Sequence, residues 1–221
     1  MKVQYLGDSR DSFKWDYHDF LTSALEYPML NVILMLTPDD NSSEGQTHPE
    51  NYPARKCTID FCHDLQEHRN LQLIQKLPFI AGSKYTVDLH KAETHLTRSN
   101  RREYFSDICR EKQQVLFLDP DNGFEPEKSN NVKHVLYSDI DAILDEVSEE
   151  TVISVFQYFR RIPFNSDFAR IKQRLLSGSA TAIYWHSLMF VAISRSKNII
   201  DKVHDINQRY ARQYPVQVLH D

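Results

Sequence analysis

The hydrophobic and polar positions of the chain divide it into short apolar runs and longer segments with helical spacing. The runs at 31–37 and 114–119 are apolar throughout, which is typical of strands that are covered on both faces of a sheet. A short extended piece at 2–8 precedes them and stops at Gly7. Together with alternating and β-branched runs, the pattern predicts strands at 31–37, 84–90, 114–119, 151–159, 181–186 and 189–195.

Segments in which apolar residues recur every three or four positions predict helices between these strands. Residues 11–27 follow this spacing, and Asp11 or Ser12 can cap the first turn of that helix. The predicted helices are 11–27, 57–77, 96–112, 138–147, 166–178 and 197–214. Residues 38–55 form a long polar segment, and a loop of this length in a compact domain is usually functional or mobile.

The alternation of strands and helices predicts an α/β fold of the Rossmann-like kind, with an open, mostly parallel sheet flanked by helices. The strands at 181–186 and 189–195 follow one another without a helix, which predicts an antiparallel strand pair near the C-terminus. The chain has no internal repeat and no clear linker. We therefore expect residues 1–221 to form a single Rossmann-like domain.

The composition is that of an ordinary globular protein, with 41% hydrophobic and 26% charged residues, and a formal net charge of −5 argues against a strongly basic nucleic-acid-binding surface overall. Cys57, Cys62 and Cys109 cannot all pair within one chain, and their spacing does not match a zinc site. We expect reduced thiols and a cytoplasmic location. No apolar run is long enough to span a membrane, and the first residues lack the apolar core of a secretory signal, so no membrane partner is expected.

The candidate site is the sequence DPDNG, which begins at Asp119 and directly follows the apolar run. Pro120 has no N–H for the sheet ladder, and Asn122 with the glycine after it can turn the chain. Ligands of open α/β sheets bind beyond the carboxyl ends of the strands, so Asp119 and Asp121 are expected at a ligand site. The carboxylates could hold a divalent metal ion, or one could accept a hydrogen bond from an amino group, or the segment could be a turn alone.

This DPDNG sequence, called the corner below, resembles the fourth motif of class I S-adenosylmethionine-dependent methyltransferases that act on amino groups of nucleic-acid bases. That motif is Asp or Asn, two prolines and an aromatic residue, and Asp119 and Pro120 match it. Asp121 stands at the second proline, Asn122 replaces the aromatic residue, and Phe124 offers a ring two positions later. The resemblance implies a catalytic role for the first three of these residues and substrate contacts for the last two.

The amino-terminal sequence resembles the opening of ribosomal-RNA adenine-N6 methyltransferases of the large-subunit type, Gly-Asn-x-x-Asp-x-x-Lys-His. Gly7, Asp8, Asp11 and Lys14 fit this spacing, with Asp in place of Asn and Trp15 in place of His. Asp11 and Lys14 are three positions apart and therefore share one helix face. The resemblance implies S-adenosylmethionine as the cofactor, with the four matching residues on the cofactor side of the site.

The opening and the corner are also similar to those of a group of uncharacterised bacterial and phage proteins, which carries no function to transfer. The glycine motif that methyltransferases place after the first strand is missing here, because Gly45 is the only glycine in the polar segment 38–55. A close backbone approach to a cofactor is difficult without glycine. A non-catalytic, degenerate Rossmann-like binding protein is therefore one alternative.

The run FLDPDNG is similar, too, to the Asp-x-Asp motif of haloacid-dehalogenase-type phosphatases and of nucleotide-sugar glycosyltransferases. In both classes the two carboxylates, here Asp119 and Asp121, would hold Mg²⁺ against phosphate. A metal-dependent enzyme that transfers or hydrolyses phosphoryl or glycosyl groups is therefore a second alternative.

Basic residues make nucleic acid a candidate partner. Arginines cluster within 98–102 beside aromatic residues, and Arg160 follows the predicted strand at 151–159. Such a patch can meet a phosphate backbone, and Arg160 is expected on the substrate side, although charge runs are also typical of solvated surfaces.

Overall fold

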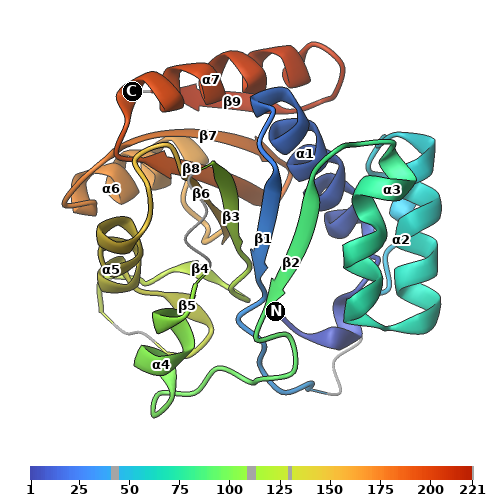
Figure 1. The fold of residues 1–221 in the computed structure, drawn as a ribbon, viewed down its shortest axis with the longest axis horizontal. Coiled ribbons are helices and arrows are strands. Elements are labelled where there is room, and N and C mark those ends of the chain that lie inside the picture. Colours follow the sequence, from blue (N-terminus) through green and yellow to red (C-terminus); the bar gives the residue numbers. More distant parts are fainter. Residues whose placement is uncertain (41–44, 109–112, 129–130, 221) are drawn as a thin grey trace.

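The computed structural model describes residues 1–40, 45–108, 113–128 and 131–220 of the chain. A seven-stranded sheet with helices on both faces forms its centre, and a two-stranded sheet lies beside it (Figure 1). The order of the strands in the large sheet is β2-β1-β3-β6-β8-β7-β9. The predicted α/β, Rossmann-like fold is confirmed.

The large sheet combines a parallel part with an antiparallel part. Its strands are β1 (Met29–Ile33), β2 (Thr86–His90), β3 (Gln114–Leu118), β6 (Val152–Tyr158), β7 (Ser179–Trp185), β8 (Leu188–Ser194) and β9 (Gln217–His220). Strands β2, β1, β3 and β6 are parallel. Strand β8 is antiparallel to both β6 and β7, which confirms the antiparallel pair predicted near the C-terminus.

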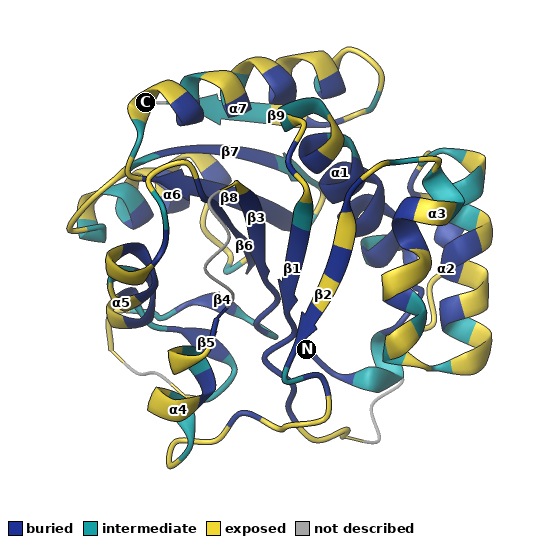
Figure 2. Ribbon diagram, in the orientation of Figure 1, coloured by how far each residue is buried: buried dark blue, intermediate teal, exposed yellow. Residues whose placement is uncertain are grey.

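The helices pack on the sheet in two groups. They are α1 (Ser9–Leu25), α2 (Lys56–His68), α3 (Leu77–Ala81), α4 (Arg101–Ser106), α5 (Tyr137–Glu146), α6 (Phe164–Arg174) and α7 (Lys197–Ala211). Three short 3-10 turns accompany them: η1 (Val3–Tyr5), η2 (Pro49–Asn51) and η3 (Leu71–Lys76). The core on one face lies under α1, α2, α3 and α7, and the core on the other face lies under α4, α5 and α6 (Figures 1 and 2).

The central strand β3 is buried on both faces, as its apolar sequence predicts. Val115 and Phe117 join the core under α1, whereas Leu116 and Leu118 join the core on the opposite face. Side chains alternate between the faces of a sheet, so the next position belongs to the α1 face. This alternation directs Asp119 toward α1.

Strand β1 is shorter than predicted because the backbone turns after it. The sequence pattern predicts a strand at 31–37, but β1 ends at Ile33. Met35 has a φ of 47°, which a β-strand cannot accommodate. The residues beyond leave the sheet, and the N–H of Thr37 donates to the carbonyl of Met1.

The helix predicted at 57–77 is also interrupted. Arg69 adopts a left-handed conformation with a φ of 48° and ends α2, after which η3 and α3 complete the segment. The helix predicted at 96–112 is reduced to α4, and residues 109–112 lie outside the described residues. The first residues form the 3-10 turn η1 instead of the predicted extended piece.

Three short strands have no counterpart in the predicted pattern. Strands β4 (Gly123–Phe124) and β5 (His134–Val135) form the small parallel sheet, and β9 pairs with β7 at the edge of the large sheet. Two residues are too few to show a periodicity of two. Strands β4 and β5 are therefore invisible to a pattern-based prediction, whereas β9 has four residues and lies beyond the last predicted helix.

The structure bears on membrane association and on the state of the cysteines. Within the described ranges, no helix has both the length and the apolar character needed to cross a lipid bilayer. Cys57 and Cys62 are free thiols, and Cys109 lies outside the described residues.

Helix α1 is fixed to its neighbours by a buried ionic network. Asp16 is fully buried and accepts hydrogen bonds from the Arg55 Nε at 2.7 Å, the Tyr210 hydroxyl at 2.9 Å and the Thr58 hydroxyl at 2.9 Å. A second nitrogen of Arg55, Nη1, lies 2.8 Å from the carboxylate of Asp19. The network joins α1 to α2 and α7 and so sets the position of the amino-terminal end of α1.

We expect Asp16→Ala to lower the free energy of unfolding by about 3–5 kcal/mol, because it leaves buried donors and a partly buried guanidinium without an acceptor. Urea unfolding followed by circular dichroism would measure the change. The matched control is Asp60→Ala, which removes an exposed ion pair with Lys56 and should change stability by about 0.5 kcal/mol or less. Equal effects of the two variants would contradict an anchoring role for the network.

Candidate functional site

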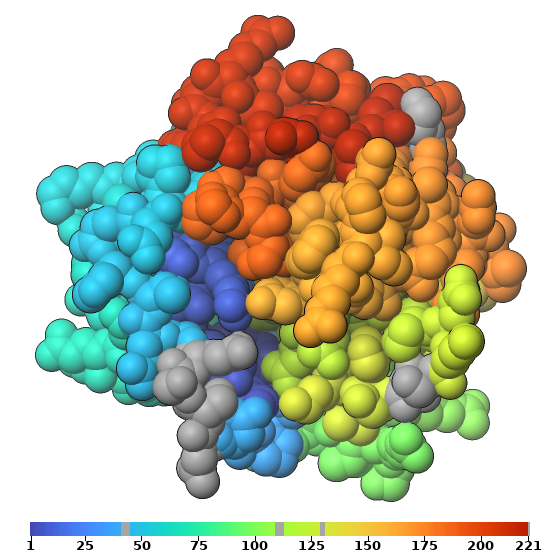
Figure 3. Space-filling view, turned by 180° about the vertical axis from the view of Figure 1, so that it is seen from behind, coloured from blue at the N-terminus to red at the C-terminus, as the bar shows by residue number. Residues whose placement is uncertain are grey.

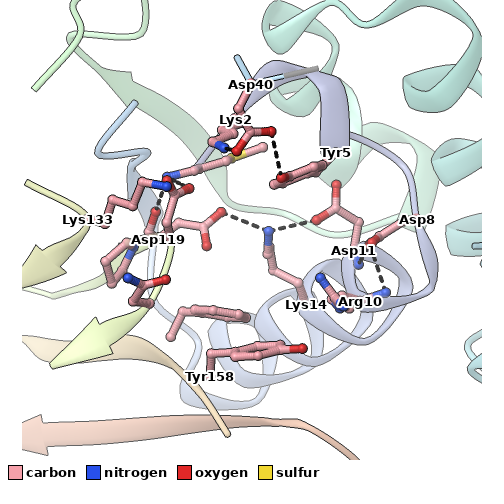
Figure 4. Close-up of a pocket in the computed structure, with 15 residues that line it drawn as sticks. Lys2, Tyr5, Asp8, Arg10, Asp11, Lys14, Asp40, Asp119, Lys133 and Tyr158 are labelled. Atoms are coloured by element: carbon pink, nitrogen blue, oxygen red, sulfur yellow. Dashed lines mark hydrogen bonds and ion pairs between the residues drawn. The ribbon is translucent and has the colours of Figure 1, made fainter. Parts of the chain in front are cut away.

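A pocket of about 320 Å³ opens at the carboxyl ends of β3 and β6. Its walls come from the amino-terminal segment, the first turns of α1, the DPDNG corner and the last residues of β6 (Figure 4). Seen from behind, the amino-terminal residues in blue lie between the cyan segment and the yellow-green and orange segments (Figure 3). The structure thus brings the opening sequence and the corner to the same pocket.

Lys14 joins the two segments at the base of the pocket. Its Nζ lies 2.6 Å from Asp11 Oδ1 and 2.7 Å from Asp119 Oδ2, and its side chain is only 6% exposed (Figure 4). Burial alone would lower the pKa of Lys14, but the carboxylates of Asp11 and Asp119 outweigh burial and raise that pKa. The ammonium group therefore stays charged and does not serve as a base or a nucleophile.

The two carboxylates of the corner have different partners. Burial raises the pKa of Asp119 above its ordinary value, although Lys14 opposes this effect. Asp121 Oδ1 lies 2.8 Å from the α-amino group of Met1, and its Oδ2 accepts a hydrogen bond from the Thr37 hydroxyl. Burial would raise the pKa of Asp121 as well, but the ammonium group of Met1 holds that pKa below its usual value. The ion-pair partner of the Asp119 carboxylate is thus Lys14, and that of Asp121 is Met1.

The opening sequence builds the start of α1. Gly7 has a φ of 80°, and a Cβ atom there would lie 2.2 Å from the carbonyl oxygen of Cys62, so only glycine fits. Its N–H donates to Asp11 Oδ2 at 2.8 Å. Asp8 Oδ1 accepts from the N–H groups of Arg10 and Asp11, so Asp8 caps the helix in place of the predicted Asp11 or Ser12.

Asp8 is the strongly perturbed acid of the pocket. It is 2% exposed, and burial together with the neighbouring charge of Asp11 raises its pKa to about 6. A carboxylic acid with this pKa exchanges its proton close to neutral pH. Groups of this kind are enriched at functional sites.

Two residues with expected substrate contacts lie outside the pocket. Phe124 is fully buried and stacks on Tyr137 with ring centroids 5.4 Å apart. Arg160 donates from Nη1 to the carbonyl of Phe124 at 2.7 Å and from Nη2 to Gln157 Oε1 at 3.1 Å. The chain turns at Gly123, with a φ of 96°, and directs Phe124 into the small sheet, while Arg160 after β6 supports that sheet through its bond to Phe124. Pro120, Asp121 and Asn122 do line the pocket.

Other pocket residues were not singled out from the sequence. Phe156 and Tyr158 end β6 on the face that carries α1, while Gln157 between them is buried on the opposite face against Phe124. The guanidinium of Arg10 lies over the ring of Tyr158 at 5.2 Å. Side chains of the predicted strand at 151–159 alternate between two faces, and this alternation places Phe156 and Tyr158 on the same face. Lys133 and Asp40 come from polar segments whose sequence gives no signal.

Comparison with protein-family models and with curated proteins gives no match for this chain. The site is therefore interpreted from its own geometry. Among the described residues, no three His, Cys, Asp or Glu side chains are arranged to hold a metal ion. Because Asp119 and Asp121 are bonded to separate ammonium groups, the residues of the corner do not fit a shared Mg²⁺ site.

We expect Lys14→Met to destabilise the protein by about 3–5 kcal/mol, because it leaves the carboxylates of Asp11 and Asp119 buried without their cation. Chemical unfolding of the variant would measure this loss. The double variant Lys14→Met/Asp119→Asn removes one of the two uncompensated charges and should recover part of it. No recovery in the double variant would show that the Lys14–Asp119 contact is energetically unimportant.

Asp8→Asn should stabilise the protein at neutral pH and not at acidic pH. Folding raises the pKa of Asp8 from 3.8 to about 6, so its contribution to stability is full at low pH and is lost as the pH rises through 6. Asparagine caps α1 without a charge. We expect the variant to match the wild type near about pH 4 and to exceed it by on the order of 1–3 kcal/mol at about pH 7.5.

Urea unfolding of both proteins at the two pH values would test this expectation for Asp8. Asp60→Asn, on the exposed surface of α2, is the matched control and should show no comparable change with pH. A difference for Asp8→Asn that is the same at both pH values would be inconsistent with the raised pKa.

Proposed function

We propose that this pocket binds S-adenosylmethionine and that the protein transfers a methyl group to an amino group. One observation carries the proposal. The two segments that resemble methyltransferase motifs, which begin at Gly7 and Asp119, line one pocket and are joined through Lys14 across 105 residues of sequence. If the DPDNG segment were only a turn, its contact with the opening sequence would remain unexplained.

The sheet supports the same proposal. Ligands of open α/β sheets bind beyond the carboxyl ends of the parallel strands, and the pocket lies at this edge of β3 and β6. The antiparallel pair β7–β8 after the last parallel strand is also the ending that the resemblance implies.

The residues of the pocket fit the chemical groups of the cofactor. S-adenosylmethionine carries a purine ring, hydroxyl groups, a sulfonium, an ammonium and a carboxylate. Phe156 and Tyr158 offer aromatic surface for the purine, and the carboxylate of Asp8 offers an acceptor for hydroxyl or ammonium groups. Arg10 offers a guanidinium for the cofactor's carboxylate. When bound, the cofactor supplies an electrophilic methyl group.

The corner supplies acceptors for an amine. The backbone carbonyl of Asp119 accepts from the α-amino group of Met1 at 3.1 Å, and the carboxylate of Asp121 lies 2.8 Å from the same nitrogen. These oxygens are thus already arranged around an amino nitrogen. An acceptor amine that took the place of the Met1 amino group at these oxygens would keep its N–H groups engaged and direct its lone pair away from the corner.

The proton released from the methylated nitrogen needs a base nearby. Burial raises the pKa of Asp119, which makes its carboxylate a better proton acceptor than an ordinary aspartate. Lys14 fixes the orientation of that carboxylate through Oδ2. In this proposal Asp119 orients the amine and takes up its proton, while Lys14 acts as a positioning residue.

We expect calorimetric titration with S-adenosylmethionine, and with its demethylated product, to give a dissociation constant between about 1 µM and 1 mM. Tyr158→Ala should weaken binding about tenfold, because it removes aromatic contact area worth roughly 1–3 kcal/mol. Phe79→Ser is the control, since Phe79 is 89% exposed and does not line the pocket. Absence of binding to the folded wild type at millimolar ligand would overturn the proposal and favour a non-catalytic binding protein.

A further inference from the structure

A second polar cluster lies outside the pocket, between α5, α6 and the end of β6. Asp167 Oδ1 lies 2.7 Å from Arg170 Nη2 and 3.5 Å from Arg160 Nη2. The guanidinium of Arg174, one helical turn after Arg170, lies over the ring of Tyr137 at 4.3 Å. The three arginines and Tyr137 therefore form one group around a single aspartate.

The cluster holds more positive than negative charge. The carboxylates that face it are Asp167, which is bonded to two of the arginines, and Glu125, whose Oε1 accepts from the backbone N–H of Tyr137 at 2.9 Å. Three guanidinium groups thus meet two carboxylates. Burial lowers the pKa of Arg160, the carboxylate of Asp167 opposes this effect, and the positive charge of Arg170 adds to it. Like charges held this close are unfavourable unless an anion compensates them.

Several polar atoms of the cluster are buried without a hydrogen-bond partner. They are the Tyr137 hydroxyl, Arg160 Nε, Arg174 Nη1 and Asp167 Oδ2. Tyr137 is only 6% exposed, and Asp167 only 1%. Buried polar groups in native proteins are nearly always paired, and each exception calls for a water, an ion or a ligand. Three of these four atoms can donate a hydrogen bond, which suits an oxyanion as their common partner.

We propose that Arg160, Arg170, Arg174 and Tyr137 bind a phosphate group. Guanidinium groups match phosphate in charge and in the geometry of their donors. The Tyr137 hydroxyl adds a neutral donor. Asp167 Oδ2, the one unpaired acceptor, can receive the hydrogen of a P–OH group, which hydrogen phosphate has and sulfate lacks. This inference does not depend on the methyltransferase proposal.

The cluster is accessible and lies near the pocket. The side chains of Arg160 and Arg170 are 17% and 18% exposed, so solvent reaches them. Arg160 follows the pocket residue Tyr158 by two positions and donates to the carbonyl of Phe124, two residues after the pocket residue Asn122. Helices α5 and α6 lie next to one another beside the small sheet (Figure 1).

Thermal unfolding at constant ionic strength, with inorganic phosphate titrated against chloride, would test this site. We expect a saturable rise in Tm for the wild type, a binding constant about tenfold weaker for sulfate, and no rise for the double variant Arg170→Gln/Arg174→Gln. Arg161→Gln removes an exposed arginine next to the cluster and should respond to phosphate like the wild type. Equal phosphate responses of the wild type and the double variant, or equal binding of sulfate, would overturn the proposal.

Tyr137→Phe separates binding from folding. It removes only an unpaired hydroxyl, so without phosphate the variant should be at least as stable as the wild type. With phosphate it should bind several-fold more weakly, and an unchanged affinity would contradict a role for the hydroxyl. A nucleoside 5′-monophosphate, measured alongside, identifies the source: tighter binding than phosphate assigns the group to a nucleotide, and weaker binding assigns it to free phosphate.

Discussion

The contact of Lys14 with Asp11 and Asp119 is the interaction on which the site depends. It places one ammonium group between two buried carboxylates that belong to distant parts of the sequence. An isolated charge at this depth would be strongly unfavourable, so each of the three groups requires the others. The contact therefore fixes the start of α1 against the end of β3 and creates the pocket wall at the same time.

The buried charges around this contact are costly for the folded state. Replacing a buried ion pair by apolar residues is often neutral or stabilising, so an ionic pocket floor is not needed to hold the sheet and α1 together. Asp8 adds a further buried carboxylate whose charge is unfavourable at neutral pH. Buried groups of this kind lower stability, and perturbed acids are enriched where ligands bind.

The sequence predicts the architecture well where the elements are long. The buried runs and the amphipathic helices locate the large sheet, its layers and its antiparallel pair, because burial imposes a clear period on them. The left-handed turns at Met35 and Arg69, which shorten β1 and α2, have no comparable signal, since neither residue is a glycine or an asparagine. The two-residue strands β4 and β5 depend on tertiary pairing alone.

The candidate site was predictable only in part, where its residues lie in or directly after a regular strand or helix. The strand-end argument identifies Asp119, and the resemblance of the opening sequence identifies Asp11 and Lys14; the structure joins all three. Phe124 was expected beside the substrate from the resemblance and Arg160 from its place after a strand, but the turn at Gly123 and the contacts of Arg160 with the small sheet have no signal in the sequence. Lys133 and Asp40 enter the pocket from loops, whose paths are set by contacts far along the chain.

The position of β8 between β6 and β7 affects how the sheet can fold during synthesis of the chain. When β6 and β7 have left the ribosome, neither yet has its partner β8, because the strand that separates them in the sheet follows both in sequence. Until Leu188–Ser194 arrives, β6 presents an open apolar edge, the kind of surface on which nascent chains associate wrongly. The β7–β8 hairpin, closed by a short turn, is the local unit that can form first and then cover that edge.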